Sequence, residues 1–287
     1  MVPTFAEHRV LDYYSTLVRK GAVTKVAVGV DIGSLTAKTA IVDLNSHIAS
    51  YKIIQGKIVD EAAAIASLNQ ALADAHLTQA EIGFLITTGY GRNMVSFGDK
   101  SITEISCHAR GAQFLFPGVR TVIDIGGQDS KVISLNGEGS VINFAMNDKC
   151  AAGTGRFLEV MANALEVPIE DMGALSLRAE NPATVSSICT VFAESEVISL
   201  TAQGRSKLDI IAGIHEAIGR RMHSLVNHVG MTAPVMMSGG VAKNLGVVCV
   251  LERLLGTEMI LPPEPQIVGA LGAALFAMDE LKAKSIS

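Results

Sequence analysis

Hydrophobic and polar positions along the chain follow two periods, one typical of strands and one typical of amphipathic helices. Apolar runs that read as buried strands end in glycine-containing turns at three places: 25–34, 82–91 and 233–240. Apolar residues recur at helical spacing in five segments: 58–77, 102–116, 157–165, 192–200 and 268–281. This mixture of strands and helices predicts an α/β fold.

One strand–turn–strand pattern occurs twice in the sequence. The segments VDIGSLTAK and IDIGGQDSK both reduce to D-I-G-x-x-x-x-K, with their aspartates at Asp31 and Asp124, 124 − 31 = 93 residues apart. Two copies of one element predict a duplicated fold of two similar lobes. We expect a helical N-terminal extension, a first lobe that includes the C-terminal helix, and a second lobe: 1–24, 25–118 with 265–287, and 119–264.

Both copies place an aspartate and bare glycine backbone at the end of a buried strand. Glycine lets the backbone approach a phosphate closely, and successive N–H groups form an anion-binding nest. Asp31 could hold Mg²⁺ through water, since Mg²⁺ favours carboxylate and phosphate oxygens. A third turn, at residues 238–240, would admit the adenosine. Lys38 and Lys131 could equally reach phosphate or remain solvated. The three turns together predict a nucleotide cleft between the lobes.

Other polar residues near these turns are candidates for assisting phosphoryl transfer, which depends mainly on positioning and charge. Gln128 and Asp129 follow the second turn, where a side chain could orient the attacking water or the Mg²⁺ shell. Glu104 stands four residues before His108 in a predicted helix. The pair is either a solvated helix-surface pair, or Glu104 lies on the cleft floor near the phosphates.

The chain has four cysteines: Cys107, Cys150, Cys189 and Cys249. The N-terminal region lacks a secretory pattern, which predicts a cytoplasmic protein without disulfides. Cys150 and Cys189 each precede a predicted helix, whose N-terminus would favour a thiolate, and neither belongs to a C-x-x-C pair. On the residues alone a buried, inert cysteine remains the alternative. Cys249 lies in an apolar run and is expected in the core, and Cys107 is expected to be structural.

Composition excludes two classes of partner. With 287 residues and a net charge of −5, the chain has no basic surplus with which to neutralise nucleic-acid phosphates. No apolar run approaches the roughly 18 residues that a membrane-spanning helix requires. We therefore expect neither a nucleic-acid nor a membrane partner.

The motifs resemble those of the superfamily of actin, the sugar kinases and the chaperone ATPases. The two phosphate motifs and the adenosine motif of that superfamily match 31–38, 124–131 and 238–244. More narrowly, four segments are similar to activators (component A) of 2-hydroxyacyl-CoA dehydratases, which are ATPases of the BadF/BadG/BcrA/BcrD type: 88–93, 103–112, 147–159 and 189–200. The resemblance covers residues 26–277 and implies a duplicated ribonuclease H-like, actin-like ATPase fold.

The resemblance also implies the ligands and the residues that hold them. We assign ATP or ADP to fourteen residues: Gly33, Ser34, Leu35, Thr36, Ala37, Lys38, Gly126, Gly127, Gln128, Asp129, Gly239, Gly240, Lys243 and Gln266. The catalytic candidates, which would act with Mg²⁺, are Asp31, Glu104, Gln128 and Asp129. Cys150 and Cys189 are implied to be two of the four thiolates of one [4Fe–4S] cluster, which a twofold homodimer completes.

The implied activity is ATP-dependent transfer of single low-potential electrons from ferredoxin or flavodoxin into a cluster-bearing dehydratase or reductase. Three alternatives remain open. One is a small-molecule kinase of the same superfold, which needs a cleft base that the sequence does not show. Another is a reductase for benzoyl-CoA-type or double-cubane-cluster enzymes. The third is a non-catalytic, actin-like filament protein, which would need a repeating interface and not one closed by a twofold axis.

Overall fold

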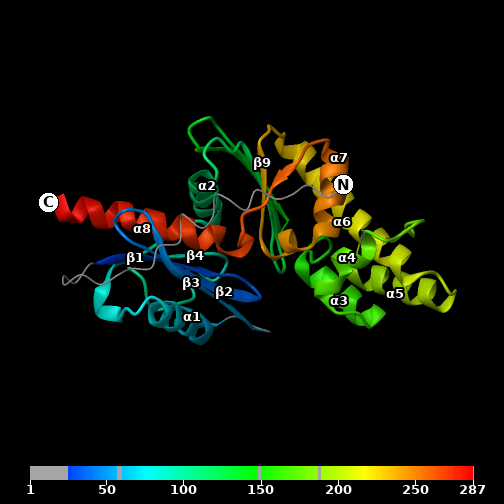
Figure 1. Cartoon of the computed structure of the whole chain (residues 1–287), viewed down its shortest axis with the longest axis horizontal. Coiled ribbons are helices and arrows are strands. Elements are labelled where there is room, and N and C mark those ends of the chain that lie inside the picture. The colour runs from blue at the N-terminus through cyan, green and yellow to red at the C-terminus, as the bar shows by residue number, and fades with distance from the viewer. Residues whose placement is uncertain (1–24, 57–59, 148–149, 187–188, 287) are drawn as a thin grey trace. The chain divides into compact units, whose positions relative to one another are not determined.

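A computed structural model describes residues 25–56, 60–147, 150–186 and 189–286 of the chain (Figure 1). The helix expected within residues 1–24 lies outside the described residues. The chain divides into two compact units. Unit 1 comprises Met1–Leu115 and Gln266–Ser287, and unit 2 comprises Phe116–Pro265.

Unit 1 contains a five-stranded sheet in the order β3-β2-β1-β4-β5. Its strands are β1 (Val26–Ile32), β2 (Thr36–Val42), β3 (Ile48–Gln55), β4 (Ile82–Thr88) and β5 (Lys100–Ser101). The first three strands are antiparallel, and β4 and β5 continue the sheet in parallel with β1. A hairpin meander followed by parallel strands is therefore the sheet topology of this unit.

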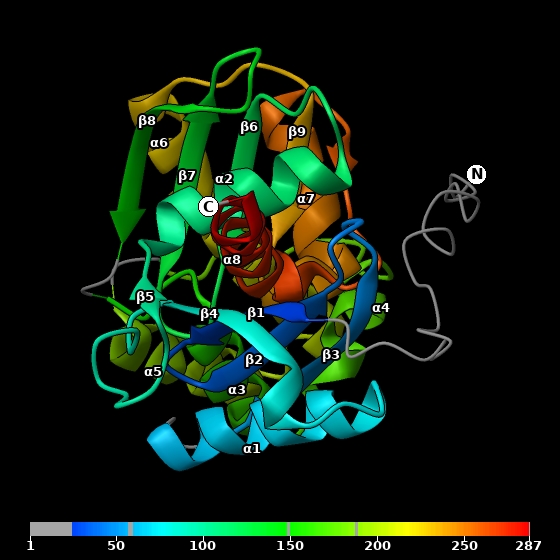
Figure 2. The same ribbon diagram turned by 90° about the vertical axis from the view of Figure 1, so that its left-hand side faces the viewer.

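Helices cover both faces of the unit 1 sheet. They are α1 (Glu61–Asp74), α2 (Glu104–Leu115) and α8 (Val268–Ile286), with a 3₁₀ turn at Gln79–Glu81. Figure 2 shows α1 on one face and α2 with α8 on the other. Val28 and Val30 pack toward α1, whereas Ala27 packs toward α8. Strand β1 is buried on both faces, which explains its uninterrupted apolar sequence.

Unit 2 repeats this topology with the strand order β10-β9-β6-β7-β8. Its strands are β6 (Thr121–Ile125), β7 (Ser130–Leu135), β8 (Val141–Asn147), β9 (Val235–Ser238) and β10 (Met259–Ile260). Strands β6, β7 and β8 form the antiparallel meander, and β9 runs parallel to β6. Read from β8, the order matches that of unit 1 strand for strand. The duplicated, two-lobed, actin-like ATPase fold is thus confirmed.

The helices of unit 2 enclose its largest apolar cluster. They are α3 (Gly155–Leu165), α4 (Met172–Ser176), α5 (Thr190–Ala202), α6 (Lys207–Val229) and α7 (Leu245–Leu255), with 3₁₀ turns η3 (Ile169–Asp171) and η4 (Gly240–Lys243). A further 3₁₀ turn, η5 (Pro265–Ile267), spans the boundary between the two units. Helix α3 packs against α5, and α6 packs against α4 and α7. In the described part of both units, no helix combines the length and apolarity needed to cross a bilayer.

Candidate functional site

The turn between β1 and β2 holds the first aspartate of the repeat. Asp31 is paired across the strands with Lys38, and the Lys38 Nζ donates to Asp31 Oδ2 at 3.1 Å. The Gly33 N–H closes the turn by donating to the Thr36 carbonyl at 3.0 Å. Asp31 is 4% exposed, and the Lys38 side chain is 14% exposed. Lys38 is therefore part of the turn and not a solvated lysine.

The turn between β6 and β7 reproduces this geometry in unit 2. Lys131 lies across the strands from Asp124 and donates to its Oδ2 at the same 3.1 Å. Lys131 Nζ also lies 2.8 Å from Asp129 Oδ2, and the Gly126 N–H donates to the Asp129 carbonyl at 2.9 Å. Both Asp124 and Lys131 are 3% exposed. The solvated alternative for Lys131 is therefore wrong.

A glycine from the neighbouring parallel strand closes each aspartate site. Gly89 follows β4 with φ +88°, and Gly239 follows β9 with φ +84°. A Cβ on Gly89 would lie 2.3 Å from Asp31 Oδ1, and one on Gly239 would lie 3.0 Å from Asp124 Oδ1. The positive φ and the close approach both require glycine. Beside Gly239, the Ser238 hydroxyl donates to Asp124 Oδ1 at 2.8 Å.

The two aspartates therefore differ in how fully their oxygens are engaged. Asp124 accepts a hydrogen bond from Lys131 on Oδ2 and one from Ser238 on Oδ1. Asp31 receives Lys38 on Oδ2, and the described residues show no hydrogen bond to its Oδ1. Because Mg²⁺ binds through carboxylate oxygens and retained water, Asp31 fits a magnesium-shell role better than Asp124 does.

Sequence reasoning missed a histidine close to Asp31. His108 on α2 is 6% exposed, and its Nδ1 lies 2.9 Å from the Glu104 carbonyl oxygen. The solvated-pair interpretation therefore does not hold for His108. A Cβ on Gly269 would lie 2.9 Å from His108 Cε1 and 3.1 Å from Asp31 Oδ2, so those two atoms are at most about 6 Å apart. The sequence signal for the proximity of His108 to Asp31 is limited to Gly269, the small residue at the start of α8.

The remaining nucleotide candidates lie in the turns. Residues 34–36 are half-buried in the turn after β1 and at the first position of β2, and Gln128 is exposed within the turn between β6 and β7. Gly240 begins η4, and Lys243 ends it with its Nζ 2.8 Å from Glu264 Oε2. Gln266 lies in η5, directly before α8. Each unit thus presents one phosphate-type turn, and unit 2 adds the turn predicted to receive adenosine.

The two cysteine segments differ in their relation to the helices. Cys189 is the N-cap residue of α5, and its carbonyl accepts from the Ala193 N–H at 3.0 Å. Cys150 precedes α3, which begins two residues earlier than the predicted helix at 157–165. In the intervening turn the Thr154 hydroxyl donates to the Ala151 carbonyl at 2.6 Å. Thr154 is the N-cap residue there. Both cysteines are half-buried free thiols.

Two polar side chains hold the loop that carries Cys150. The Asn147 Nδ2 donates to the Cys150 carbonyl at 2.9 Å. Arg221, on α6, donates through Nη2 to Asn147 Oδ1 at 3.1 Å. A Cβ on Gly153 would lie 3.0 Å from Arg221 Cδ, so the arginine stem packs against the same loop. Helix α6 therefore anchors the backbone at Cys150.

The same loop is hydrogen-bonded to the second phosphate turn. The Gly155 N–H donates to the Gly126 carbonyl at 2.9 Å, and the Arg156 N–H donates to the Gly127 carbonyl at 2.7 Å. These are the first two N–H groups of α3, which have no partner within the helix. The start of α3 thus joins the Cys150 loop to the phosphate turn by two short backbone contacts.

The chain offers two partly accessible thiols as candidate cluster ligands, Cys150 and Cys189. Across the described residues, no group of three or more histidine, cysteine or acidic side chains is placed to hold a metal ion. A [4Fe–4S] cluster needs four thiolates. Both cysteines lie in unit 2: Cys150 in the loop before α3, and Cys189 at the N-cap of α5, which packs against α3.

The other two cysteines have different environments. Cys107 is fully buried, and this burial raises the pKa of its thiol to about 12, which keeps it inert. The prediction for Cys249 was wrong, because it is exposed. Helix α7 buries the face that carries Gly246, Val247, Val248 and Leu251. At about 100° per residue Cys249 falls outside that face, although its neighbours in the sequence are apolar.

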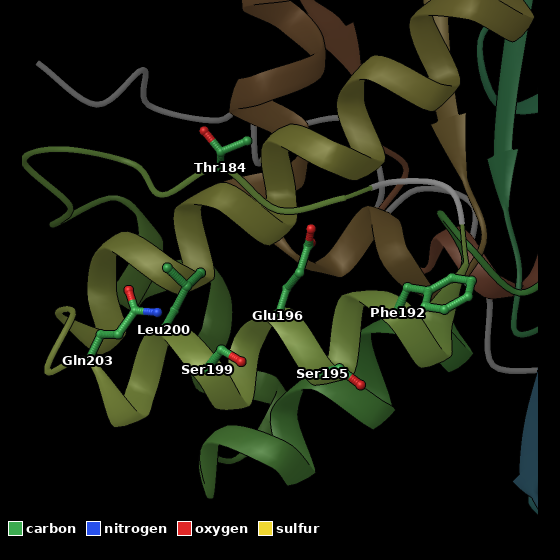
Figure 3. A pocket seen from close by; sticks show the side chains of 7 residues that line it. All are labelled: Thr184, Phe192, Ser195, Glu196, Ser199, Leu200 and Gln203. Atoms are coloured by element: carbon green, nitrogen blue, oxygen red, sulfur yellow. The ribbon is translucent and has the colours of Figure 1, made fainter.

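A hollow of about 520 Å³ lies along α5 (Figure 3). Five of the side chains that line it come from α5: Phe192, Ser195, Glu196, Ser199 and Leu200. Thr184 and Gln203, outside the helix, complete the lining. At its cysteine end, Val191 and Phe192 are each 65% exposed. The surface beside Cys189 is therefore apolar in the single chain.

The chain is similar in sequence to a known family of ATPases. The model of the BadF/BadG/BcrA/BcrD ATPase family matches residues 28–277. The 2-hydroxyisocaproyl-CoA dehydratase activator of Clostridioides difficile is 47% identical over 255 residues, which cover 88% of this chain and 95% of that protein. The (R)-2-hydroxyglutaryl-CoA dehydratase activating ATPase of Acidaminococcus fermentans is 48% identical over 250 residues, covering 87% of this chain and 95% of that protein.

A solved structure agrees with these relatives. The activator of the 2-hydroxyisocaproyl-CoA dehydratase from Clostridium difficile with bound ADPNP superimposes with a TM-score of 0.87 at 45% identity, covering 91% of this chain and 97% of that one. The repeated phosphate-type turns, the fold and a family match over most of the sequence agree with one another. The chain belongs to the BadF/BadG/BcrA/BcrD ATPase family.

Proposed function

We propose that this chain is an ATP-dependent activator that passes single low-potential electrons to a partner enzyme of the 2-hydroxyacyl-CoA dehydratase type. The observation that carries the proposal is the hydrogen-bonded connection between the Cys150 loop and the phosphate turn of unit 2. The names of relatives that are 47% and 48% identical, both activators of such dehydratases, support the choice of partner.

The nucleotide part of the proposal rests on the two turns and η4. The N–H groups of each turn, other than those of Gly33 and Gly126 that close the turns, bind phosphate oxygens. Asp31 orients the Mg²⁺ shell through Oδ1. Gln128 is exposed in the turn between β6 and β7, where it can contact the attacking water. Glu104, at the start of α2, is proposed to act in this catalytic set. Gly239 and Gly240 leave space for adenosine. Hydrolysis then depends on positioning and charge more than on a strong base.

The cluster part of the proposal rests on unit 2. A [4Fe–4S] cluster, when bound, accepts and donates one electron. Cys150 and Cys189 would hold it, and a second copy of the chain would supply the same two residues across a twofold axis. The exposed Val191 and Phe192 beside Cys189 are the apolar side chains that such a partner copy would cover. The electron donor is proposed to be a small carrier such as ferredoxin or flavodoxin.

Coupling requires that ATP bind two conformations of the protein with different affinity. A change at the Gly126 and Gly127 carbonyls would reach the Cys150 loop through Gly155 and Arg156, because these residues are directly hydrogen-bonded. Thermodynamic coupling is reciprocal. The redox state of the cluster must therefore change the affinity for ATP by the same factor by which ATP changes the stability of the reduced cluster.

The test is to purify the protein without oxygen and to measure iron, sulfide and the visible spectrum. Cys150→Ser is the test variant, and Cys249→Ser is the matched control, because Cys249 is exposed on α7. We expect about four irons per dimer in the wild type and the control, and loss of iron and colour in Cys150→Ser. An iron-free wild type after reconstitution, or a Cys150→Ser variant that keeps four irons, would refute the cluster assignment.

A second measurement separates this proposal from a kinase of the same fold. ATP affinity is measured with the cluster oxidised and then reduced by dithionite, under anaerobic conditions. The proposal expects a difference of at least about fivefold, the lower end of typical coupling. Equal affinities, together with phosphorylation of an added small molecule, would favour the kinase.

A further inference from the structure

A buried hydrogen-bond network lies beside the turn predicted to receive adenosine. His215, on α6, has no exposed surface. Its Nδ1 lies 2.9 Å from the Ser176 Oγ at the end of α4, and its Nε2 lies 3.2 Å from the Asn244 Nδ2 between η4 and α7. Three elements of unit 2 thus meet at one imidazole ring.

The protons of this network can be assigned from the remaining contacts. The Ser176 hydroxyl donates to the Gly173 carbonyl at 2.9 Å, so its oxygen accepts from His215 Nδ1–H. The Asn244 Oδ1 accepts from the Val247 N–H at 3.2 Å, which orients the amide so that its Nδ2 donates to His215 Nε2. His215 is therefore neutral, with its proton on Nδ1. Burial, which lowers the pKa of this histidine to about 4, agrees with the assignment.

Asn244 is the residue through which this network reaches the nucleotide turn. It ends η4 directly after Lys243, and it is the N-cap residue of α7. A Cβ on Gly246 would lie 2.5 Å from His215 Nδ1 and 2.2 Å from Ser176 Oγ, so α7 packs directly on the network. The side chain that caps α7 and ends η4 is thus held by the histidine ring.

We infer that His215 is a positioning residue for the nucleotide, acting through Asn244 to fix η4 where adenosine binds. The inference rests on the proposed nucleotide site. His215 does not touch the ligand. Its acceptor at Nε2 selects one orientation of the Asn244 amide, and that orientation fixes where the turn ends and the helix begins. Loss of this acceptor frees the amide and lowers affinity for ATP and ADP.

Two substitutions at position 215 separate positioning from a merely structural role. In His215→Gln, Oε1 replaces Nε2 as the acceptor for Asn244, and the donor to Ser176 is lost. In His215→Asn, the amide replaces Nδ1–H as the donor to Ser176, and the acceptor for Asn244 is lost. Both variants remove the ring. They differ in which partner keeps its hydrogen bond.

The readout is the dissociation constant for ADPNP with Mg²⁺, measured by calorimetry, beside the urea midpoint of each variant. We expect about tenfold weaker binding in His215→Asn, as for loss of one buried hydrogen bond, and binding within about threefold of wild type in His215→Gln. Ser176→Ala serves as a control and should bind like His215→Gln. Equal affinities for the two variants at position 215 would overturn the inference.

A variant at the other end of the hydrogen bond keeps the test informative if His215→Asn does not fold. Asn244→Ser retains an N-cap oxygen for α7 but removes the amide that donates to His215. It should weaken ADPNP binding to the same extent, and wild-type affinity would overturn the inference. A wild-type protein that binds no nucleotide would instead refute the proposed nucleotide site.

Discussion

Replacing Lys131 by methionine should destabilise unit 2 strongly, because the lysine neutralises a buried carboxylate. Its Nζ lies 3.1 Å from Asp124 Oδ2 and 2.8 Å from Asp129 Oδ2. The side chains of Lys131 and Asp124 are each 4% exposed. Removing one member of such a buried pair costs about 3–5 kcal/mol. Since Ser238 still donates to Asp124, we expect the lower end, about 3 kcal/mol of unfolding free energy.

The assay is urea unfolding followed by far-ultraviolet circular dichroism. Lys38→Met is the matched control: its Nζ lies at the same 3.1 Å from Asp31 Oδ2, but its side chain is 14% exposed. That variant should lose less, about 1–2 kcal/mol. The double variant Lys131→Met/Asp124→Asn should recover much of the loss, because the only carboxylate of the pair of contacts that keeps its charge is Asp129, whose side chain is 22% exposed. The reasoning is refuted if Lys131→Met is no less stable than Lys38→Met, or if the double variant is less stable than Lys131→Met.

Three further outcomes are expected. Gly239→Ala places a Cβ 2.3 Å from the Ile125 carbonyl oxygen at φ +84°. The variant should lose about 1–3 kcal/mol of unfolding free energy and bind ADPNP more weakly. Unchanged affinity for ADPNP would contradict the geometry. A thiol reagent at pH 8 should modify the exposed Cys249 in the folded protein, and Cys107 only after denaturation. Mass spectrometry would detect both modifications, and rapid modification of Cys107 in the folded protein would refute its burial. Burial lowers the pKa of His215 from 6.5 to about 4. Between pH 6.5 and pH 4 the unfolded chain therefore binds a proton at this histidine that the folded chain does not. The free energy of unfolding should fall by up to about 3 kcal/mol as the pH drops from 6.5 to 4. His215→Gln should lack that part of the slope in urea titrations, and a wild-type slope would contradict the assignment.

The duplicated phosphate turns could be predicted because their signal is local and occurs twice. The D-I-G-x-x-x-x-K pattern implies two short antiparallel strands around a tight turn, and the structure pairs Asp31 with Lys38 and Asp124 with Lys131. The strand order follows less directly, since β4 and β9 reach their partners only through long connections. Local pattern therefore predicted each turn, whereas contacts across the sheet emerged only in three dimensions.

Side-chain environments on helices were the least predictable part. Cys249 stands among apolar neighbours, but whether it is buried depends on which face of α7 packs against α6. His215 looked unremarkable in the sequence because its partners, Ser176 and Asn244, are 39 and 29 residues away. No periodicity or motif links residues at such separations. Contacts of this kind follow from tertiary packing, which a single sequence does not display.

The two copies of the repeat have diverged in a way that suits different tasks. In unit 1 only one oxygen of Asp31 carries a hydrogen bond among the described residues, which leaves the other available to water around a metal ion. In unit 2 both oxygens of Asp124 are engaged, and the adjoining Gly126 and Gly127 carbonyls receive the start of α3. A turn held by this many hydrogen bonds moves together with the start of α3, which is bonded to it. Packed interiors shift between discrete arrangements and do not deform continuously. The proposed coupling therefore needs the second turn to be rigid, and the hydrogen bonds around Asp124 supply that rigidity in unit 2, which carries Cys150 and Cys189.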